Sequence, residues 1–284
     1  MKKETNQKSS IKKPSFYLYV TEVIRAFKDY RKLSSFKKSF KNNFQADGHP
    51  VLLIPGFMSS DVSTLPLRRF IKQLGYVSYG WEMERNIGKV EKLDLLLKRI
   101  EKLYQKHQQK VTLIGWSLGG VYARQLAKAN PEFIRQIITL GSPFSGLTEP
   151  NNASWLFPLL HDGKKVEELE SDWLIDIPAP APVPTTAIYT KEDGIVSWRV
   201  CMEQKIDAIH QNIQVSGSHI GLGVNAAVWY IIADRLRYKE ENWTLFKKTP
   251  EILEAELAHA NTNEKIVEDE DKFRPEGPGI GLIK

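Results

Sequence analysis

Residues 46–249 alternate between short apolar runs and longer amphipathic segments, and this alternation constrains the fold more than any other feature. The runs expected to form strands are Val51–Pro55, Tyr76–Met83, Val111–Trp116, Ile134–Leu140, Thr185–Tyr189 and Ile213–Val215. The segments expected to form helices are Thr64–Leu74, Lys89–Gln108, Leu118–Ala129 and Asn225–Leu236. Strands separated by helices of this length pair in parallel through crossover connections. The sequence therefore predicts an α/β fold, a mostly parallel open sheet with helices on both faces.

The helix expected after the first strand has signals at both ends. Thr64 is a candidate N-cap, and Pro66 suits the first turn of a helix. Gly75 suits the C′ position, where the backbone leaves the helix in a left-handed conformation.

Charge divides the chain into three parts. The formal net charge is +6, but residues 1–45 hold 12 Lys and Arg against 3 Asp and Glu, whereas residues 250–284 hold 4 against 9. We therefore expect a basic N-terminal arm over 1–45, an α/β domain over 46–249 and an acidic, flexible C-terminal tail over 250–284. Because the positive charge lies mainly outside the domain, no nucleic-acid partner is expected.

Apolar residues recur at helical spacing through residues 16–44, among many lysines. Two interpretations of this amphipathic helix stay open. It rests on an anionic membrane surface, or it packs on the domain with its lysines solvated.

The sequence shows no secretory signal and no run of 18 apolar residues. The apolar stretch Phe16–Val20 is soon interrupted by Thr21, Glu22 and Arg25. The single cysteine, Cys201, excludes a disulfide framework and a cysteine-based zinc cluster. We expect a cytoplasmic protein, with peripheral contact at the inner membrane face if the arm binds lipid.

Residues 145–184 interrupt the alternation of strands and helices. The segment is longer than most connections, carries aromatic residues such as Trp155, Phe157 and Trp173, and ends in the proline-rich stretch 177–184. It is too apolar for a disordered linker, so it is predicted to be a lid insertion over a substrate site.

The hexapeptide Gly115–Gly120 places a serine between an expected strand and an expected helix. A serine hydroxyl becomes a nucleophile when a neighbouring base takes its proton. A sharp turn between strand and helix can present it, and small residues two positions before and after, here Gly115 and Gly119, allow that turn. We predict that Ser117 is a nucleophile.

Where this turn occurs, an acid and then a histidine follow the serine along the chain. His219 comes directly after the last strand, at the sheet edge where sites of open α/β sheets form, and is the predicted base. Asp193 follows the strand Thr185–Tyr189 and is predicted to orient the histidine, with Glu192 as the alternative.

Three other histidines follow Ser117 but suit the role less well. His161 lies in the expected lid, His259 in the acidic tail, and His210 before the last strand, on an expected solvated helix or loop.

An oxyanion needs preorganised N–H donors, and the predicted donors are the backbone N–H groups of Phe57 and Leu118. Gly56 allows the tight turn that precedes Phe57. No metal-binding or phosphate-binding motif is present, so neither a metal nor a cofactor is expected. Cys201 lacks an accompanying histidine pattern and is not expected to be a nucleophile.

These residues resemble the α/β-hydrolase superfamily, in particular its bacterial lipase- and esterase-like members. The matching segments are His49–Gly56, Gly115–Gly120, Leu140–Pro143, Tyr189–Trp198 and Gly217–Asn225. Asp193–Trp198 is similar to the acid loop of lipase-like members that also resemble glycosylphosphatidylinositol-deacylating enzymes. The resemblance implies a triad of Ser117, Asp193 and His219. Trp116 departs from the histidine that many lipases carry there, which leaves the substrate class open.

The leading hypothesis is a serine hydrolase that cleaves a carboxylic ester, of a small molecule or a lipid, through an acyl-enzyme on Ser117. One alternative passes the acyl group to an alcohol or lipid acceptor. Another is a membrane-recruited scaffold without catalysis, which the basic arm would favour.

Overall fold

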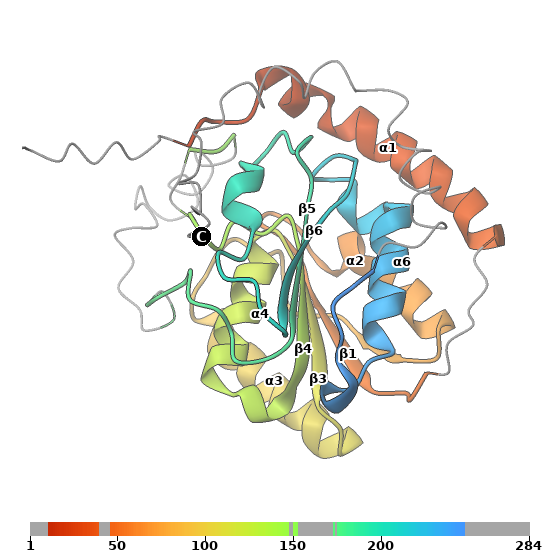
Figure 1. Ribbon diagram of the computed structural model, residues 1–284, viewed down its shortest axis with the longest axis vertical. Coiled ribbons are helices and arrows are strands. Elements are labelled where there is room, and N and C mark those ends of the chain that lie inside the picture. Colours follow the sequence, from red (N-terminus) through yellow and green to blue (C-terminus); the bar gives the residue numbers. More distant parts are fainter. Residues whose placement is uncertain (1–10, 40–45, 148–149, 153–172, 174, 248–284) are drawn as a thin grey trace, which may run out of the picture.

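The computed structural model describes residues 11–39, 46–147, 150–152, 173 and 175–247. Its centre is a six-stranded sheet in the order β2-β1-β3-β4-β5-β6, with every described pairing parallel (Figure 1). The strands are β1 (Pro50–Ile54), β2 (Val77–Tyr79), β3 (Val111–Trp116), β4 (Ile134–Leu140), β5 (Thr185–Tyr189) and β6 (His210–Gln214). The predicted parallel α/β architecture is confirmed.

Helices cover both faces of this sheet (Figure 1). The α-helices are α1 (Phe16–Ser39), α2 (Asp61–Gln73), α3 (Lys92–His107), α4 (Leu118–Ala129) and α6 (Ala226–Leu236). Side chains alternate between the faces of a strand. In β1, Val51 and Leu53 accordingly pack in the core beneath α2 and α6, whereas Leu52 and Ile54 pack in the core beneath α3 and α4.

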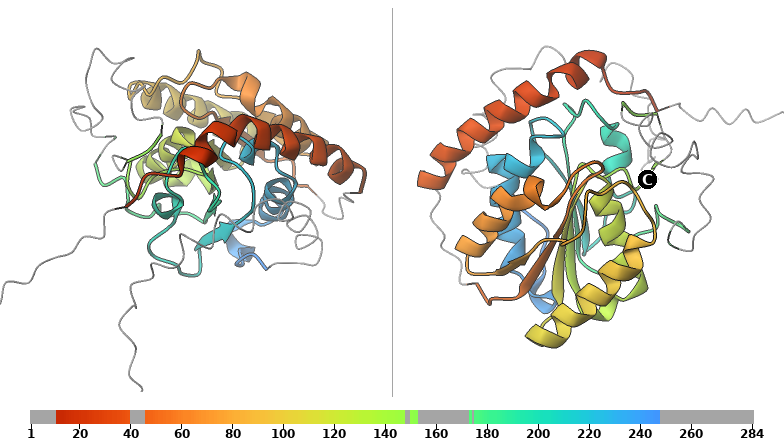
Figure 2. Two further views of the ribbon diagram at one scale, coloured as in Figure 1. Left: turned by 90° about the horizontal axis from the view of Figure 1, so that it is seen from above. Right: turned by 180° about the vertical axis from the view of Figure 1, so that it is seen from behind.

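Helix α1 belongs to neither layer, although its Leu33 joins the core beneath α2 and α6. It runs along the outside of the molecule, over the loops that follow β5 and β6 (Figures 1 and 2). Short 3-10 turns complete the fold, at Pro131–Phe133, Trp198–Cys201, Leu222–Val224 and Glu240–Asn242. No helix of the described residues is long and apolar enough to cross a membrane.

The start of α2 differs from the prediction. The helix begins at Asp61 and not after Thr64, so Pro66 lies inside it. The Asp61 carboxylate accepts hydrogen bonds from the backbone N–H groups of Trp81 and Glu82, at 3.0 and 2.9 Å, which fixes the helix start against the end of β2. The predicted end is confirmed, because Gly75 follows the helix with φ +101°.

The last strand also differs, because β6 begins at His210, which was expected in a solvated helix or loop. The ring of His210 is buried between the Asp207 carboxylate and the Ala181 carbonyl, at 2.9 and 2.8 Å, and these bonds satisfy a polar side chain inside the sheet. The strand predicted over 76–83 is shorter, and forms only Val77–Tyr79.

Most of the predicted lid lies outside the described residues, as does the acidic tail after residue 247. The end of the lid segment is described and packs on α4. Arg124 of that helix donates a hydrogen bond to the Ala179 carbonyl at 2.8 Å, and Ala181 and Val183 join the core beneath α3 and α4.

Candidate active site

Ser117 occupies a strained turn between β3 and α4. Its φ of 51° and ψ of −122° lie in a region that side-chain-bearing residues rarely adopt. A Cβ on Gly119 would lie 2.2 Å from the carbonyl oxygen of Ile54, and one on Gly115 would lie 2.3 Å from the Cα of Gly120. Glycines are therefore required on both sides of the serine for the turn to form.

Two hydrogen bonds fix this turn to its surroundings. The backbone N–H of Ser117 donates to the carbonyl of Leu140 at the end of β4, at 2.8 Å. The indole N–H of Trp116 donates to the carbonyl of His219 at 3.2 Å. Trp116, which stands where many lipases carry a histidine, thus connects the serine turn to the loop that carries His219.

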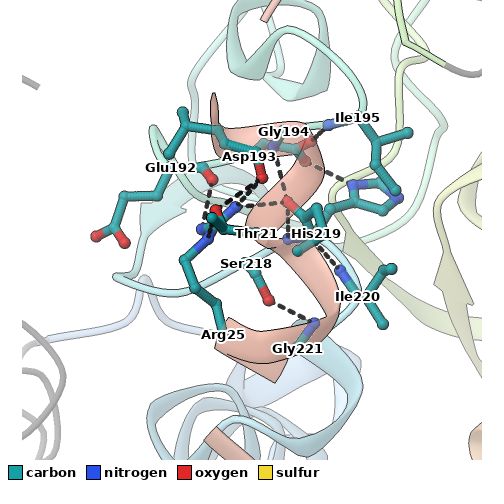
Figure 3. A network of polar contacts seen from close by, with 12 residues as sticks. Thr21, Arg25, Glu192, Asp193, Gly194, Ile195, Ser218, His219, Ile220 and Gly221 are labelled. Carbon is teal, nitrogen blue, oxygen red and sulfur yellow. Dashed lines mark hydrogen bonds and ion pairs between the residues drawn. The ribbon is translucent and has the colours of Figure 1, made fainter. Parts of the chain in front are cut away.

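Asp193 and His219 lie against one another at the ends of β5 and β6 (Figure 3). The Asp193 Oδ2 atom is 2.5 Å from His219 Nδ1, and both side chains are buried. The Oδ1 atom accepts from the N–H groups of Ile195 and Val196, each at 2.8 Å. Asp193 therefore has one oxygen for its own loop and one for the imidazole.

The alternative acid, Glu192, takes a different position. Its backbone carbonyl accepts a hydrogen bond from Arg25 at 2.8 Å, and its side chain is half-buried. In Figure 3 the Glu192 side chain points away from His219, whereas that of Asp193 points toward it. The geometry favours Asp193.

The environment of His219 determines its proton affinity. Burial by itself lowers the pKa of the imidazole, but the negative charge and hydrogen bond of Asp193, together with the charge of Glu22, outweigh burial and raise it above its ordinary value. Because Asp193 contacts Nδ1, the proton is favoured on that nitrogen, which leaves Nε2 as an acceptor.

The other described histidines are engaged elsewhere. His49 contacts Asp47 and Thr112, His107 contacts the Tyr79 hydroxyl, and His210 contacts Asp207, all within 2.9 Å. His161 and His259 lie outside the described residues.

The loop after β1 lies beside the serine. A Cβ on Gly56 would lie 3.1 Å from the Cβ of Ser117, so the residue that follows, Phe57, is close to the serine turn. Asn86 braces this loop, because its side chain donates to the Pro55 carbonyl and its backbone carbonyl accepts from Met58, at 2.8 and 2.7 Å. No sequence signal pointed to Asn86, because asparagine is common in loops for reasons unrelated to an active site.

The second predicted donor, Leu118, is the first residue of α4. The first N–H groups of a helix have no partner within the helix, and the helix dipole favours negative charge there. This position is chemically suited to stabilise an oxyanion beside Ser117.

Cys201 is fully buried, and its thiol lies 3.6 Å from the Ser197 carbonyl. Burial raises the pKa of this thiol well above its usual value, which keeps it protonated and unreactive. Among the described residues, no group of three His, Cys, Asp or Glu side chains is arranged to hold a metal ion.

Comparison with known proteins supports the fold. Residues 78–156, which include the serine turn, match the model of a family described as PGAP1-like alpha/beta domain. The structure resembles that of Aspergillus fumigatus lipase B, with a TM-score of 0.51 and 17% identity over 71% of this chain and 55% of that one. It also resembles the mature form of the Bacillus licheniformis lipase BlEst2, with a TM-score of 0.51 and 14% identity over 69% of this chain and 94% of that one.

This chain has the α/β-hydrolase fold. Comparison with curated protein sequences gave no match. The chain spans only about half the length of the fungal lipase, so similarity to that enzyme describes the shared domain. Within the α/β-hydrolase fold, the candidate residues come from the ends of β3, β5 and β6, in the chain order that the sequence predicted.

Proposed function

We propose that the protein is a serine hydrolase that cleaves a carboxylic ester through an acyl-enzyme on Ser117. The observation that carries this proposal is the buried contact between Asp193 and His219. Ser117 lies in a strained strand-to-helix turn, which the Trp116 indole connects to the His219 loop.

In the proposed reaction, His219 Nε2 takes the proton of the Ser117 hydroxyl as the oxygen attacks the ester carbonyl carbon. The resulting oxyanion accepts hydrogen bonds from the backbone N–H groups of Phe57 and Leu118. His219 then gives its proton to the departing alcohol, which leaves an acyl group on Ser117. Water, deprotonated by His219, attacks this acyl group. His219 then returns the proton to the Ser117 oxygen as its bond to the acyl carbon breaks, and the carboxylic acid is released.

The test of the nucleophile is labelling by a fluorophosphonate, which reacts with activated serines. We expect the wild type to be labelled and the Ser117→Ala variant to be unlabelled. Ser63→Ala, on α2, is the matched control and should label as the wild type does. Equal labelling of wild type and Ser117→Ala would contradict the assignment.

Substrate range calls for a separate measurement, since the lid segment that would shape the acyl site lies mostly outside the described residues. A panel of p-nitrophenyl esters with acyl chains of increasing length gives the preferred chain. Adding competing alcohols and analysing the products distinguishes hydrolysis from transfer to an alcohol or lipid acceptor.

We also propose that the N-terminal arm contacts an anionic membrane through the outer face of α1. The apolar residues of this face are between 53% and 74% exposed, and they are Phe16, Tyr17, Val20, Val23, Ile24, Phe27 and Tyr30. Exposed cations such as Lys13, Lys28 and Arg31 accompany them, whereas both carboxylates of the helix are buried. Apolar groups beside cations suit the surface of the cytoplasmic leaflet, where each cation contributes about 1 kcal/mol.

Vesicle sedimentation tests this surface. We expect binding to phosphatidylcholine vesicles only when they contain phosphatidylglycerol, and weaker binding at higher salt. Replacing Val23 and Phe27 together by Gln should abolish it. Leu95→Gln removes an exposed apolar side chain of α3 and should leave binding intact. Binding that neither salt nor the double substitution reduces would contradict the proposal.

A further inference from the structure

Helix α1 buries three charged side chains against the protein, together with the apolar residues Leu18, Ala26 and Leu33. Glu22, Arg25 and Asp29 are all buried, at 2%, 8% and 5% exposure. Buried charges are costly unless they are paired and hydrogen-bonded. Their positions therefore depend on specific partners, and those of Glu22 lie in the two loops that carry Asp193 and His219.

The Glu22 carboxylate accepts hydrogen bonds from both loops at once. Its Oε1 atom accepts from the backbone N–H of Gly194, at 2.8 Å, and from that of His219, at 3.2 Å. Its Oε2 atom accepts from the N–H of Ile220 at 2.9 Å. One side chain thus joins the residue after the predicted acid to the predicted base, although the two loops follow different strands.

Arg25 holds Glu22 in this orientation. Its guanidinium donates to Glu22 Oε1 at 2.9 Å and to the Glu192 carbonyl at 2.8 Å (Figure 3 shows Arg25 and the loop residues). The helix therefore contacts the acid loop through both members of this ion pair. Because the pair is buried, water does not screen it as it screens a surface pair.

The backbone of α1 also approaches the acid loop closely. A Cβ on Gly194 would lie 2.4 Å from the carbonyl carbon of Leu18, so only glycine fits between them. Asn152 donates to the Gly194 carbonyl at 2.7 Å, which holds this glycine from its other side. The helix and the loop are fitted to one another along the backbone as well as through charges.

We propose that Glu22 is a positioning residue that keeps the Asp193 loop and the His219 loop at a fixed separation. Helix α1 is then a part of the active site. Displacements of about 1 Å in a catalytic group can cost roughly a hundredfold in rate, so a connection of this kind acts on turnover and not only on stability. The inference rests on the proposed function, since it takes Asp193 and His219 as the catalytic pair.

The first test is Glu22→Gln, which keeps the shape of the side chain and removes its charge. We expect kcat to fall by about tenfold or more while KM changes little, because the substrate does not contact Glu22. Glu22→Asp keeps the charge but is one methylene shorter and cannot reach both loops. It should lower kcat as well and keep the pH profile of the wild type.

The second test measures the proton affinity of His219 by NMR titration of ring-labelled histidine and needs no substrate. The charged groups that face this loop are Asp193, Glu22 with its partner Arg25, and Asp29, whose Oδ2 lies 2.3 Å from where a Cβ on Gly221 would be. Removing the Glu22 charge should lower the pKa of His219, and the acidic limb of kcat/KM should move to lower pH.

Glu203→Gln is the matched control. Glu203 is a second buried carboxylate, and it is paired with Arg124 of α4. It should lower the melting temperature without moving the His219 titration. A Glu22→Gln variant with the wild-type titration, or a Glu22→Asp variant with the wild-type kcat, would overturn the proposal. Wild-type protein that shows no Ser117-dependent esterase activity would instead overturn the proposed function.

Discussion

The backbone of Ser117 takes a conformation that costs free energy, and the surrounding glycines make room for it. The glycine spacing alone predicted this turn, because the steric requirement acts between residues close in sequence. Asn86 and Glu22 act on the same site through contacts made only after folding. Glu22 and His219 are 197 residues apart, and no local pattern encodes their hydrogen bond.

At this residue scale, Gly119→Ala should abolish the esterase activity. The added Cβ would lie 2.2 Å from the Ile54 carbonyl oxygen, so the backbone must move, which typically costs about 1–3 kcal/mol. Urea unfolding and an esterase assay measure both effects. Gly48→Ala is a control at the other end of β1, where φ is +71° and an added Cβ would lie 3.9 Å from the Gly75 carbonyl oxygen, an ordinary contact, and it should keep its activity. A fully active Gly119→Ala enzyme would contradict the account of the turn.

The raised pKa of His219 predicts the pH dependence of kcat/KM. The base must be neutral, so activity should fall as the pH drops through a value above the ordinary 6.5 of histidine. The same interaction stabilises the fold fully below about pH 6.5, and that contribution is lost as the pH rises through the folded pKa. Asp193→Asn should move the acidic limb to lower pH and reduce kcat. An acidic limb of kcat/KM that Asp193→Asn leaves unchanged would count against an interaction between Asp193 and His219.

At the scale of elements, helix α1 shows what the spacing of apolar residues can predict and what it cannot. The spacing of its apolar residues predicted a helix, and the helix is present over Phe16–Ser39. Periodicity does not say which apolar residues pack on the protein. Leu18, Ala26 and Leu33 are buried, whereas Val23, Ile24 and Phe27 are exposed. The helix packs on the domain, as one of the two interpretations expected, and membrane contact of its outer face is a proposal.

Gly194→Ala is the prediction that belongs to this element. A Cβ there would collide with the backbone at Leu18, so α1 should separate from the acid loop. Arg25, now buried, would become accessible to trypsin, and kcat should fall. Limited proteolysis followed by mass spectrometry detects cleavage after Arg25. Protection equal to the wild type, with full activity, would show that the close approach is unimportant.

For the whole molecule, the parallel pairing of the strands explains why the place of the candidate site in the fold could be predicted from the sequence. The carboxyl ends of parallel strands lie at one edge of a sheet, so the chain order of Ser117, Asp193 and His219 was enough to predict that they follow β3, β5 and β6 at that edge. The sequence left Glu192 as an alternative to Asp193. The two carboxylates are adjacent in the chain, and the conformation of the loop decides which of them points toward His219. The contact of 2.5 Å between Asp193 Oδ2 and His219 Nδ1 favours Asp193.

The central claim is that an acyl group passes through Ser117, and trapping that intermediate tests it most directly. A reaction with a p-nitrophenyl ester is quenched in acid, digested with trypsin and examined by mass spectrometry. Cleavage after Lys110 and Arg124 releases the peptide 111–124, whose single serine is Ser117. We predict that this peptide gains the mass of the acyl group and that the adduct is absent from Ser117→Ala. Ester turnover with no adduct on this peptide, or an adduct that persists in Ser117→Ala, would contradict the account.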